Sequence, residues 1–374
     1  MLVSELPTAA TRSTTGRWFL VLAGTLWGTG GLTGSLLART ADLAAPAVAS
    51  FRLGVGGLLI LAFLALTRRP LPRGRLDGPR LLPRGRLEKP RLLPIGRLDG
   101  PRLPRHDRVD GPGLPRHDRV GGPGLLPRGR LAWTRIVVLG LLAAGFQASY
   151  FAAVAATGVS LATLVSIGAS PVLVLLAEAV TGRRRPSPRQ LATAGLALAG
   201  LTLLVGVPSG GRDLTAMLLG AGFALLAAAG FATMTLVGSR PVAGLDDLTA
   251  TGFGFTLGAA ALAPLAAAGP GLAFTPEPAA LGLLLLLGAG PTAIAYAAYF
   301  RGLRTTSAGA AALMALLEPL VGTVLAVLIL GDRLGPAGMA GAVVLIVALV
   351  LEQLAGRSDH GPGGPGTTAD QRVE

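Results

Sequence analysis

The chain has 374 residues, of which 51% are hydrophobic and only 14% are charged, and its mean hydropathy is +0.62. Soluble proteins carry about 25% charged residues, so this composition, with its long apolar blocks, indicates an integral membrane protein. The absence of cysteine excludes disulfides, thiol catalysis and cysteine-ligated metals. All three histidines lie in polar segments, so the apolar part holds no histidine cluster for a metal.

Ten apolar segments are long enough to cross a bilayer as helices, since about 20 residues span a hydrocarbon core about 30 Å thick. They lie at about residues 18–37, 43–66, 136–156, 159–180, 190–207, 214–238, 248–268, 279–300, 306–330 and 336–355. The first lacks a clear cleavage site and is followed by nine further spans, so we interpret it as a true helix and not as a signal peptide. The sequence therefore predicts an all-α integral membrane protein with ten transmembrane helices.

Arginine is concentrated in alternate loops, and this bias predicts the orientation, because positively charged loops remain on the cytoplasmic side. With the N-terminus inside, the inside loops hold Arg12, Arg17, residues 67–131, Arg183, Arg184, Arg185, Arg189, Arg240, Arg301, Arg304 and Arg357, and the outside loops hold Arg39, Arg212 and Arg333. We therefore expect a multi-pass protein of the cytoplasmic membrane. Its N-terminal tail, 1–17, and its disordered C-terminal tail, 356–374, would both lie in the cytoplasm.

Residues 67–131 form a basic insert between the second and third spans, with units such as "LPRGRLDGPRL" and "LPRHDRVDGPG" repeated from residue 71. Sixteen arginines and Lys89 against six acidic residues place most of the net charge of +14 there. Proline and glycine in every unit prevent a continuous helix, which favours a disordered cytoplasmic repeat. A polybasic patch on anionic lipid is the alternative. A nucleic-acid contact is disfavoured, because the insert has no aromatic side chain to stack on bases.

The spans outside the insert show an internal repeat. At an offset of 148 residues, Gly140 corresponds to Gly288, Thr157 to Thr305, Ala162 to Ala310, Pro171 to Pro319 and Pro188 to Pro336. Each half holds five spans, and an odd number inserts the second half upside down. The chain is therefore predicted to contain two inverted five-helix repeats, 18–207 and 208–355, an architecture by which many carriers build two gates.

Glu318 is the single charge in the ninth span, and Pro319 follows it directly. Intramembrane ionisable residues often mark substrate or proton pathways, and a proline leaves the carbonyl four residues earlier without its usual donor. The pair Ser170 and Pro171 occupies the equivalent place in the fourth span, without the acid. We expect these four residues to lie at a site between the repeats, with Glu318 coupling transport to protons. The alternative is that Glu318 only stabilises a local hydrogen-bond network at a kink.

Other polar-capable side chains within the spans are also candidates for the site. Arg52 is predicted either to bind an anionic group, to pair with Glu318, or to extend toward the outer interface. The remaining candidates are Trp27, Gln147, Tyr150, Tyr296 and Tyr299. Aromatic side chains that carry a donor suit a mostly apolar substrate pocket, but they also serve in helix packing and as interfacial anchors.

Several of these segments resemble one known family. The segments "GTLWGTGGLTGSLL", "SFRLGVGGLLILAFLAL", "SYFAAVAATGVSLATLVSIGASPVLVLLAEAVTGRR" and, most specifically, "YFRGLRTTSAGAAALMALLEPLVG" are similar to the ten-helix EamA-type branch of the drug/metabolite transporter superfamily. The resemblance covers residues 18–66 and 132–355. The insert has no counterpart in the family pattern, and Phe231 stands in the sixth span where the family often has tryptophan.

The resemblance implies a secondary active transporter that exports a small metabolite, an amino acid or a drug across the cell inner membrane, with proton exchange in some members. Its partners would be a small-molecule substrate and the lipid bilayer. The protein itself would be a monomer or a homodimer. The chain has no P-loop, no nucleophile elbow and no metal motif, so we expect no catalytic residue, no cofactor and no bound metal. The alternatives are a lipid flippase and a membrane protein whose role depends on the basic insert.

Overall fold

The computed structural model describes residues 9–67, 127, 129–206, 213–269 and 271–358. The chain divides into a helical unit, Met1–Thr67 with Leu125–Glu374, and a second unit, Arg68–Gly124. The second unit lies outside the described residues, as do residues 1–8 and 359–374. The predictions of a disordered insert and a disordered C-terminal tail therefore stay predictions.

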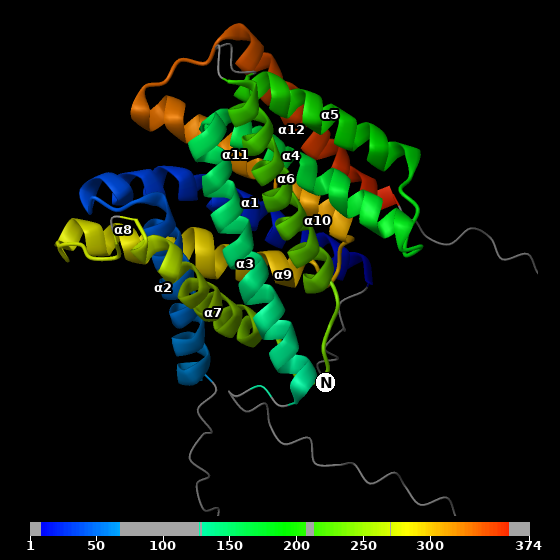
Figure 1. Ribbon diagram of the computed structural model, residues 1–374. Helices are drawn as coiled ribbons and strands as arrows, with labels where there is room; N and C mark the ends of the chain where they lie inside the picture. Colours follow the sequence, from blue (N-terminus) through cyan, green and yellow to red (C-terminus); the bar gives the residue numbers. More distant parts are fainter. Residues whose placement is uncertain (1–8, 68–126, 128, 207–212, 270, 359–374) are drawn as a thin grey trace, which may run out of the picture. The chain divides into compact units, whose positions relative to one another are not determined.

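The described chain is built from helices (Figure 1). In chain order they are α1 (Ala9–Thr40), α2 (Ala45–Thr67), α3 (Arg130–Thr157), α4 (Val159–Val180), α5 (Pro188–Val205), α6 (Leu214–Gly238), α7 (Asp247–Ala267), α8 (Pro278–Gly288), the π-helix η1 (Ala289–Ile294), α9 (Ala295–Gly302), α10 (Ala308–Met314), α11 (Leu317–Leu325), the π-helix η2 (Ala326–Leu330) and α12 (Pro336–Ser358). They contain ten segments long and apolar enough to cross a membrane, which confirms the predicted all-α membrane fold.

The eighth and ninth spans are interrupted helices. The eighth, Pro278–Gly302, consists of α8, η1 and α9, and the ninth, Ala308–Leu330, consists of α10, α11 and η2. Within η1 the hydroxyl of Thr292 donates to the carbonyl of Leu287, at 2.9 Å. Hydropathy does not distinguish an α-helical from a π-helical turn, so these segments could not be predicted from the sequence. In other proteins, π-helical turns often occur at functional sites.

The first helix begins at Ala9, well before the apolar span predicted at residue 18. The residues from Ala9 are therefore helical, whereas the membrane-length span within α1 begins at Thr15, and the cytoplasmic location of the N-terminal segment stays a prediction. Hydropathy indicates where a helix enters hydrocarbon, whereas the backbone hydrogen bonds of the helix continue into polar residues beyond the bilayer.

Pro319 has a different effect from the one that the sequence suggested. The ninth span breaks between Met314 and Leu317, and Pro319 lies in the first turn of α11, where a backbone donor is not required. The carbonyl of Ala315, expected to be free, accepts a hydrogen bond from the backbone N–H of Glu318 at 3.0 Å. Pro171, in contrast, lies within the continuous helix α4.

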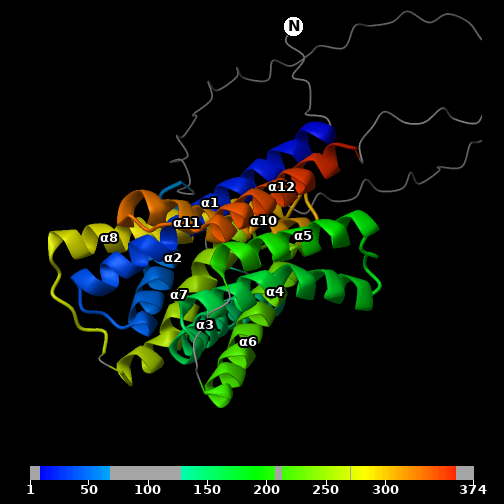
Figure 2. The ribbon, with the colours of Figure 1, turned by 90° about the horizontal axis from the view of Figure 1, so that it is seen from above.

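The helices pack in pairs that follow the internal repeat. Helix α2 packs on α7 and α5 packs on α12, so each of these helices meets its own counterpart (Figure 2). Helix α3 packs on α6 and α7, just as the eighth span packs on α1 and α2. Helix α4 packs on α6, and the ninth span packs on α1. This pattern agrees with two inverted five-helix repeats.

Close contacts of glycines show the same symmetry at residue level. A side chain at Gly220 of α6 would collide with Thr157 at the end of α3, and one at Gly16 of α1 would collide with Thr305 after α9. Thr157 and Thr305 are the pair that the sequence repeat relates. Gly16 and Trp27 are also separated by as many residues as Gly220 and Phe231, so Trp27 and Phe231 are counterparts in α1 and α6.

Candidate functional site

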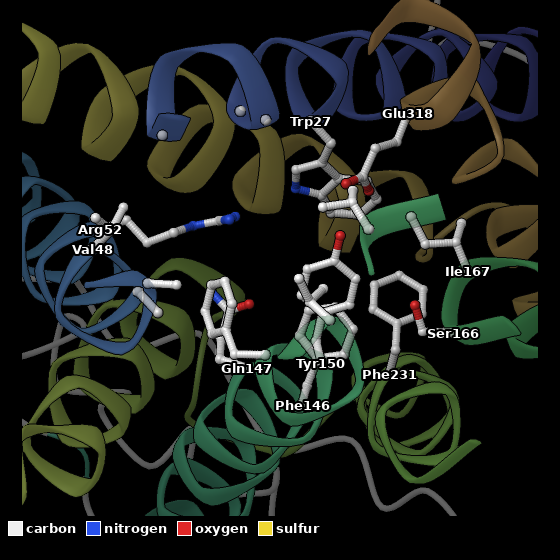
Figure 3. A pocket seen from close by; sticks show the side chains of 18 of the residues that line it. Trp27, Val48, Arg52, Phe146, Gln147, Tyr150, Ser166, Ile167, Phe231 and Glu318 are labelled. Atoms are coloured by element: carbon white, nitrogen blue, oxygen red, sulfur yellow. The ribbon is translucent and has the colours of Figure 1, made fainter. Parts of the chain in front are cut away.

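A cavity of about 310 Å³ lies between the two repeats (Figure 3). Among the residues proposed from the sequence, those that line it are Trp27, Arg52, Gln147, Tyr150, Ser170, Tyr296 and Glu318. They come from α1, α2, α3, α4, α9 and α11, so residues far apart in the chain meet at one place. The size and the mostly apolar wall are typical of a site for a small organic ligand.

Two charged side chains face each other across this cavity. Arg52 extends into it from α2 and Glu318 from the first turn of α11 (Figure 3). They are the charged members of its lining, and neither forms an ion pair with another described residue. The N-terminal end of a helix carries partial positive charge, so the start of α11 helps to accommodate a carboxylate at Glu318.

Aromatic side chains form a wall of the cavity that holds the two charged side chains. The ring centroid of Trp27 lies 5.0 Å from that of Tyr296 and 5.8 Å from that of Phe231. Phe146 continues this wall, stacked on Tyr150 at 6.2 Å and tilted against Phe231 at 6.0 Å. Such faces suit the apolar body of a solute.

Hydroxyl groups of α3 and α4 add polar atoms to the same cavity. Tyr150 is hydrogen-bonded to Thr163 at 2.9 Å. The hydroxyls of Ser166 and Ser170 donate to the backbone carbonyls four residues earlier, both at 2.6 Å. Their donors are therefore used, but each oxygen keeps a lone pair that can accept a hydrogen bond from a ligand.

Three residues proposed from the sequence do not line the cavity. Pro171 and Pro319 are buried beside Ser170 and Glu318, where they fix the local backbone. Tyr299 is only 1% exposed, and its ring lies behind Trp27 at 4.9 Å. Its hydroxyl is hydrogen-bonded to Thr235 of α6 at 2.8 Å, so it connects α6 with α9.

This position predicts that Tyr299→Phe lowers stability and leaves ligand affinity unchanged. Losing the hydroxyl removes one buried hydrogen bond, worth about 1 kcal/mol. Thermal unfolding in detergent would measure the loss. The double variant with Thr235→Val should be no less stable than Tyr299→Phe alone, because the unpaired hydroxyl is then gone as well. A large loss of ligand affinity in Tyr299→Phe would contradict the assignment.

The cavity extends toward one end of the helices. Its lining continues to Ala38, Ala45 and Val159, beside the α1–α2 and α3–α4 turns. On the other side of Trp27, the side chains of Leu20 and Leu316 are fully buried in the core. The two ends of the helices are therefore not equivalent in this structure.

Some lining residues were not proposed from the sequence. They include Phe146, Ser166 and Ile167, together with Gly30, Gly31 and Gly34 of α1. Ser166 lies one helical turn before Ser170, and this spacing was a usable signal. No sequence signal marked the three glycines as lining residues, since glycine in a membrane helix more often indicates close helix packing.

In the described part of the chain, ten apolar membrane-length spans in inverted repeats enclose a cavity with two opposed charges, an architecture typical of a multi-pass membrane transporter. The sequence model of the EamA-like transporter family matches residues 122–206 and 218–352. The chain therefore belongs to the EamA-like transporter family, which confirms the predicted resemblance.

Two further comparisons agree with this assignment. The "Uncharacterized transporter YwfM" of Bacillus subtilis (strain 168) is 29% identical over 227 residues, which are 60% of this chain and 75% of that protein. A solved crystal structure superposes with a TM-score of 0.65 at 18% identity, covering 92% of this chain and 99% of that chain. The second likeness concerns the fold alone. The family and the relative point to a transporter and not to an enzyme.

Proposed function

We propose that the protein is a secondary active exporter that carries a small metabolite, amino acid or drug across the cytoplasmic membrane in exchange for protons. The observation that carries this proposal is the pair Arg52 and Glu318, opposed across an aromatic-walled cavity between two inverted repeats. A carboxyl group at this place can bind a proton or help to bind a solute, and one group that serves both can couple the two fluxes.

Transport would proceed by alternating access, as one repeat rocks against the other around the cavity. The arginine distribution supports an N-terminus and a C-terminus in the cytoplasm. In that orientation the α1–α2 and α3–α4 turns, toward which the cavity extends, lie outside. The described conformation would then be the one that releases an exported solute.

The proposal is tested with purified protein in liposomes that contain a pH-sensitive dye. Single amino acids, carboxylic acids, amines and cationic dyes are added in turn under an imposed pH gradient. At least one solute should cause a proton flux that protein-free liposomes lack. If no solute in these classes moves protons, the proposal of proton exchange is wrong.

A second preparation, without residues 71–131, distinguishes the proposal from a role that depends on the basic insert. The cavity residues all lie outside this segment, so solute-dependent flux should persist after the deletion. Loss of flux from a correctly folded deletion variant would instead support a function of the insert.

A further inference from the structure

Three polar side chains meet in the cavity, and two of them carry buried hydrogen-bond donors that no described residue accepts. The Nε of Arg52 and the indole Nε1 of Trp27 are buried without a hydrogen-bond partner in the described part of the chain. Gln147 is only 4% exposed and lines the same cavity with its side-chain amide. Figure 3 shows all three directed into the same region of the cavity.

Unused donors in a buried site indicate a ligand that accepts hydrogen bonds. A buried polar group without a partner costs about 1–3 kcal/mol, and a charged group costs more. An arginine side chain offers donors only and no acceptor, so a hydrogen-bond partner for Arg52 must be an acceptor. Glu318 lies on the opposite wall and does not form an ion pair with it. The buried, unpartnered Nε of Arg52 therefore favours a ligand with an anionic group.

The number of charges distinguishes between possible anions. One guanidinium and two neutral donors match a single negative charge, and the planar guanidinium fits a carboxylate with two parallel hydrogen bonds. A phosphate monoester carries nearly two negative charges. In the same cavity this double charge would also face the carboxyl group of Glu318. The site therefore favours a carboxylate over a phosphate.

We propose that the transported solute carries a carboxylate, held by Arg52, Gln147 and Trp27. This inference rests on the proposed function, because it names the chemical class of the solute in the same cavity. The body of the solute lies against Phe146 and Phe231. Its far end reaches Glu318, which either binds a cationic group of the solute or stays protonated beside an uncharged end.

A fluorescence titration tests the carboxylate directly. Trp18 and Trp133 are 64% and 41% exposed and lie outside the cavity, so replacing both with phenylalanine leaves Trp27 as the reporter. The probes are benzoate, phenylalanine, benzyl alcohol and benzylamine, which share a ring and differ in charge. At neutral pH, benzoate or phenylalanine, or both, should change the Trp27 emission at concentrations about tenfold or more below those for the other two.

The two carboxylates also separate two kinds of solute. Binding of phenylalanine alone assigns Glu318 to a cationic group, whereas binding of benzoate alone assigns the far end to a solute without an amine. Both results support the carboxylate. Equal binding of all four probes, binding of benzylamine alone, or no binding by any probe would overturn it.

Matched variants assign the effect to residues. Arg52→Gln should weaken carboxylate binding about tenfold or more and should leave binding of benzyl alcohol unchanged, and Gln147→Leu should act in the same direction. Arg39→Gln is the control, because Arg39 is exposed near the end of α1 and outside the lining. Unchanged benzoate and phenylalanine affinity in folded Arg52→Gln would exclude Arg52 as the anchor.

This titration is an equilibrium measurement without a gradient, so its result is independent of proton exchange. Carboxylate binding without solute-dependent proton flux would contradict the proposed exchange and keep the carboxylate site. Solute-dependent proton flux with amines only would support proton exchange and contradict the carboxylate site.

Discussion

Replacing Glu318 by glutamine should abolish proton-driven transport while the protein still folds and inserts. Glutamine keeps the size and a hydrogen-bonding end, but it cannot take up and release a proton. Glu318 is the acidic residue of the cavity lining, so no other carboxyl group there can replace it. Solute-dependent proton flux in liposomes would fall to the level of protein-free vesicles, and exchange of labelled solute without a gradient would show whether binding survives.

The matched control for this variant is Glu277→Gln. Glu277 is exposed just before α8 and does not line the cavity, so the Glu277→Gln variant should transport like the original protein. Normal gradient-driven flux in Glu318→Gln would rule out the coupling role and favour the alternative that Glu318 only stabilises the break before α11.

A large effect on folding is expected from Gly200→Val, where α5 crosses α12. A Cβ atom at Gly200 would lie 2.6 Å from the backbone nitrogen of Leu345 and 3.0 Å from the carbonyl oxygen of Gly341. Both are backbone atoms, so neither can rotate away, and the two helices must separate. Overpacking of this kind costs about 1–3 kcal/mol or more. We expect a melting temperature lower by about 5 °C or more and less monodisperse protein after purification.

Gly195→Val on the same helix is the control for this prediction. A Cβ atom at Gly195 has no neighbour within 4 Å, so the added side chain enters open space. The two variants add the same groups to the same helix and differ in what they meet. Equal stability of Gly200→Val and Gly195→Val would show that the contact between α5 and α12 is not tight.

The spans and their inverted arrangement could be predicted from the sequence, because hydropathy over about 20 residues and a repeated set of glycines and prolines are properties of the chain itself. An interruption of the ninth span near Pro319 was also predictable, because proline disrupts the helical hydrogen bonds of a span. The use of the Ala315 carbonyl by Glu318 was not, because it depends on a tighter turn that forms only after the regular hydrogen bond is lost.

The direction in which each aromatic side chain points could be determined only from the structure. Tyr296 and Tyr299 lie within one turn of α9, yet Tyr296 lines the cavity and Tyr299 is bonded to α6. The π-helical turn η1, directly before α9, changes the rotation at which α9 starts, and no sequence pattern reveals it. The sequence therefore pointed to helical turns that border the cavity, and it left open which side chains enter the cavity.

The register between α1 and α6 has a consequence for the energy of the transport cycle. Thr235 and Gly238 of α6 contact Tyr299 and Phe300 at the closed end. Their counterparts by the repeat, Gly31 and Gly34 of α1, line the cavity at the open end. We expect the opposite conformation to close Gly31 and Gly34 against α3 and to release the contacts of Thr235 and Gly238.

Each conformation would then gain at one end the kind of contact that it loses at the other. Two states related in this way differ little in free energy, so both are populated in the absence of solute. A small differential affinity for a proton or a solute is enough to shift such a balance, since each 1.4 kcal/mol changes the ratio tenfold. In the proposed cycle, the duplicated architecture would thus let a weakly bound ligand control which side of the membrane the cavity faces.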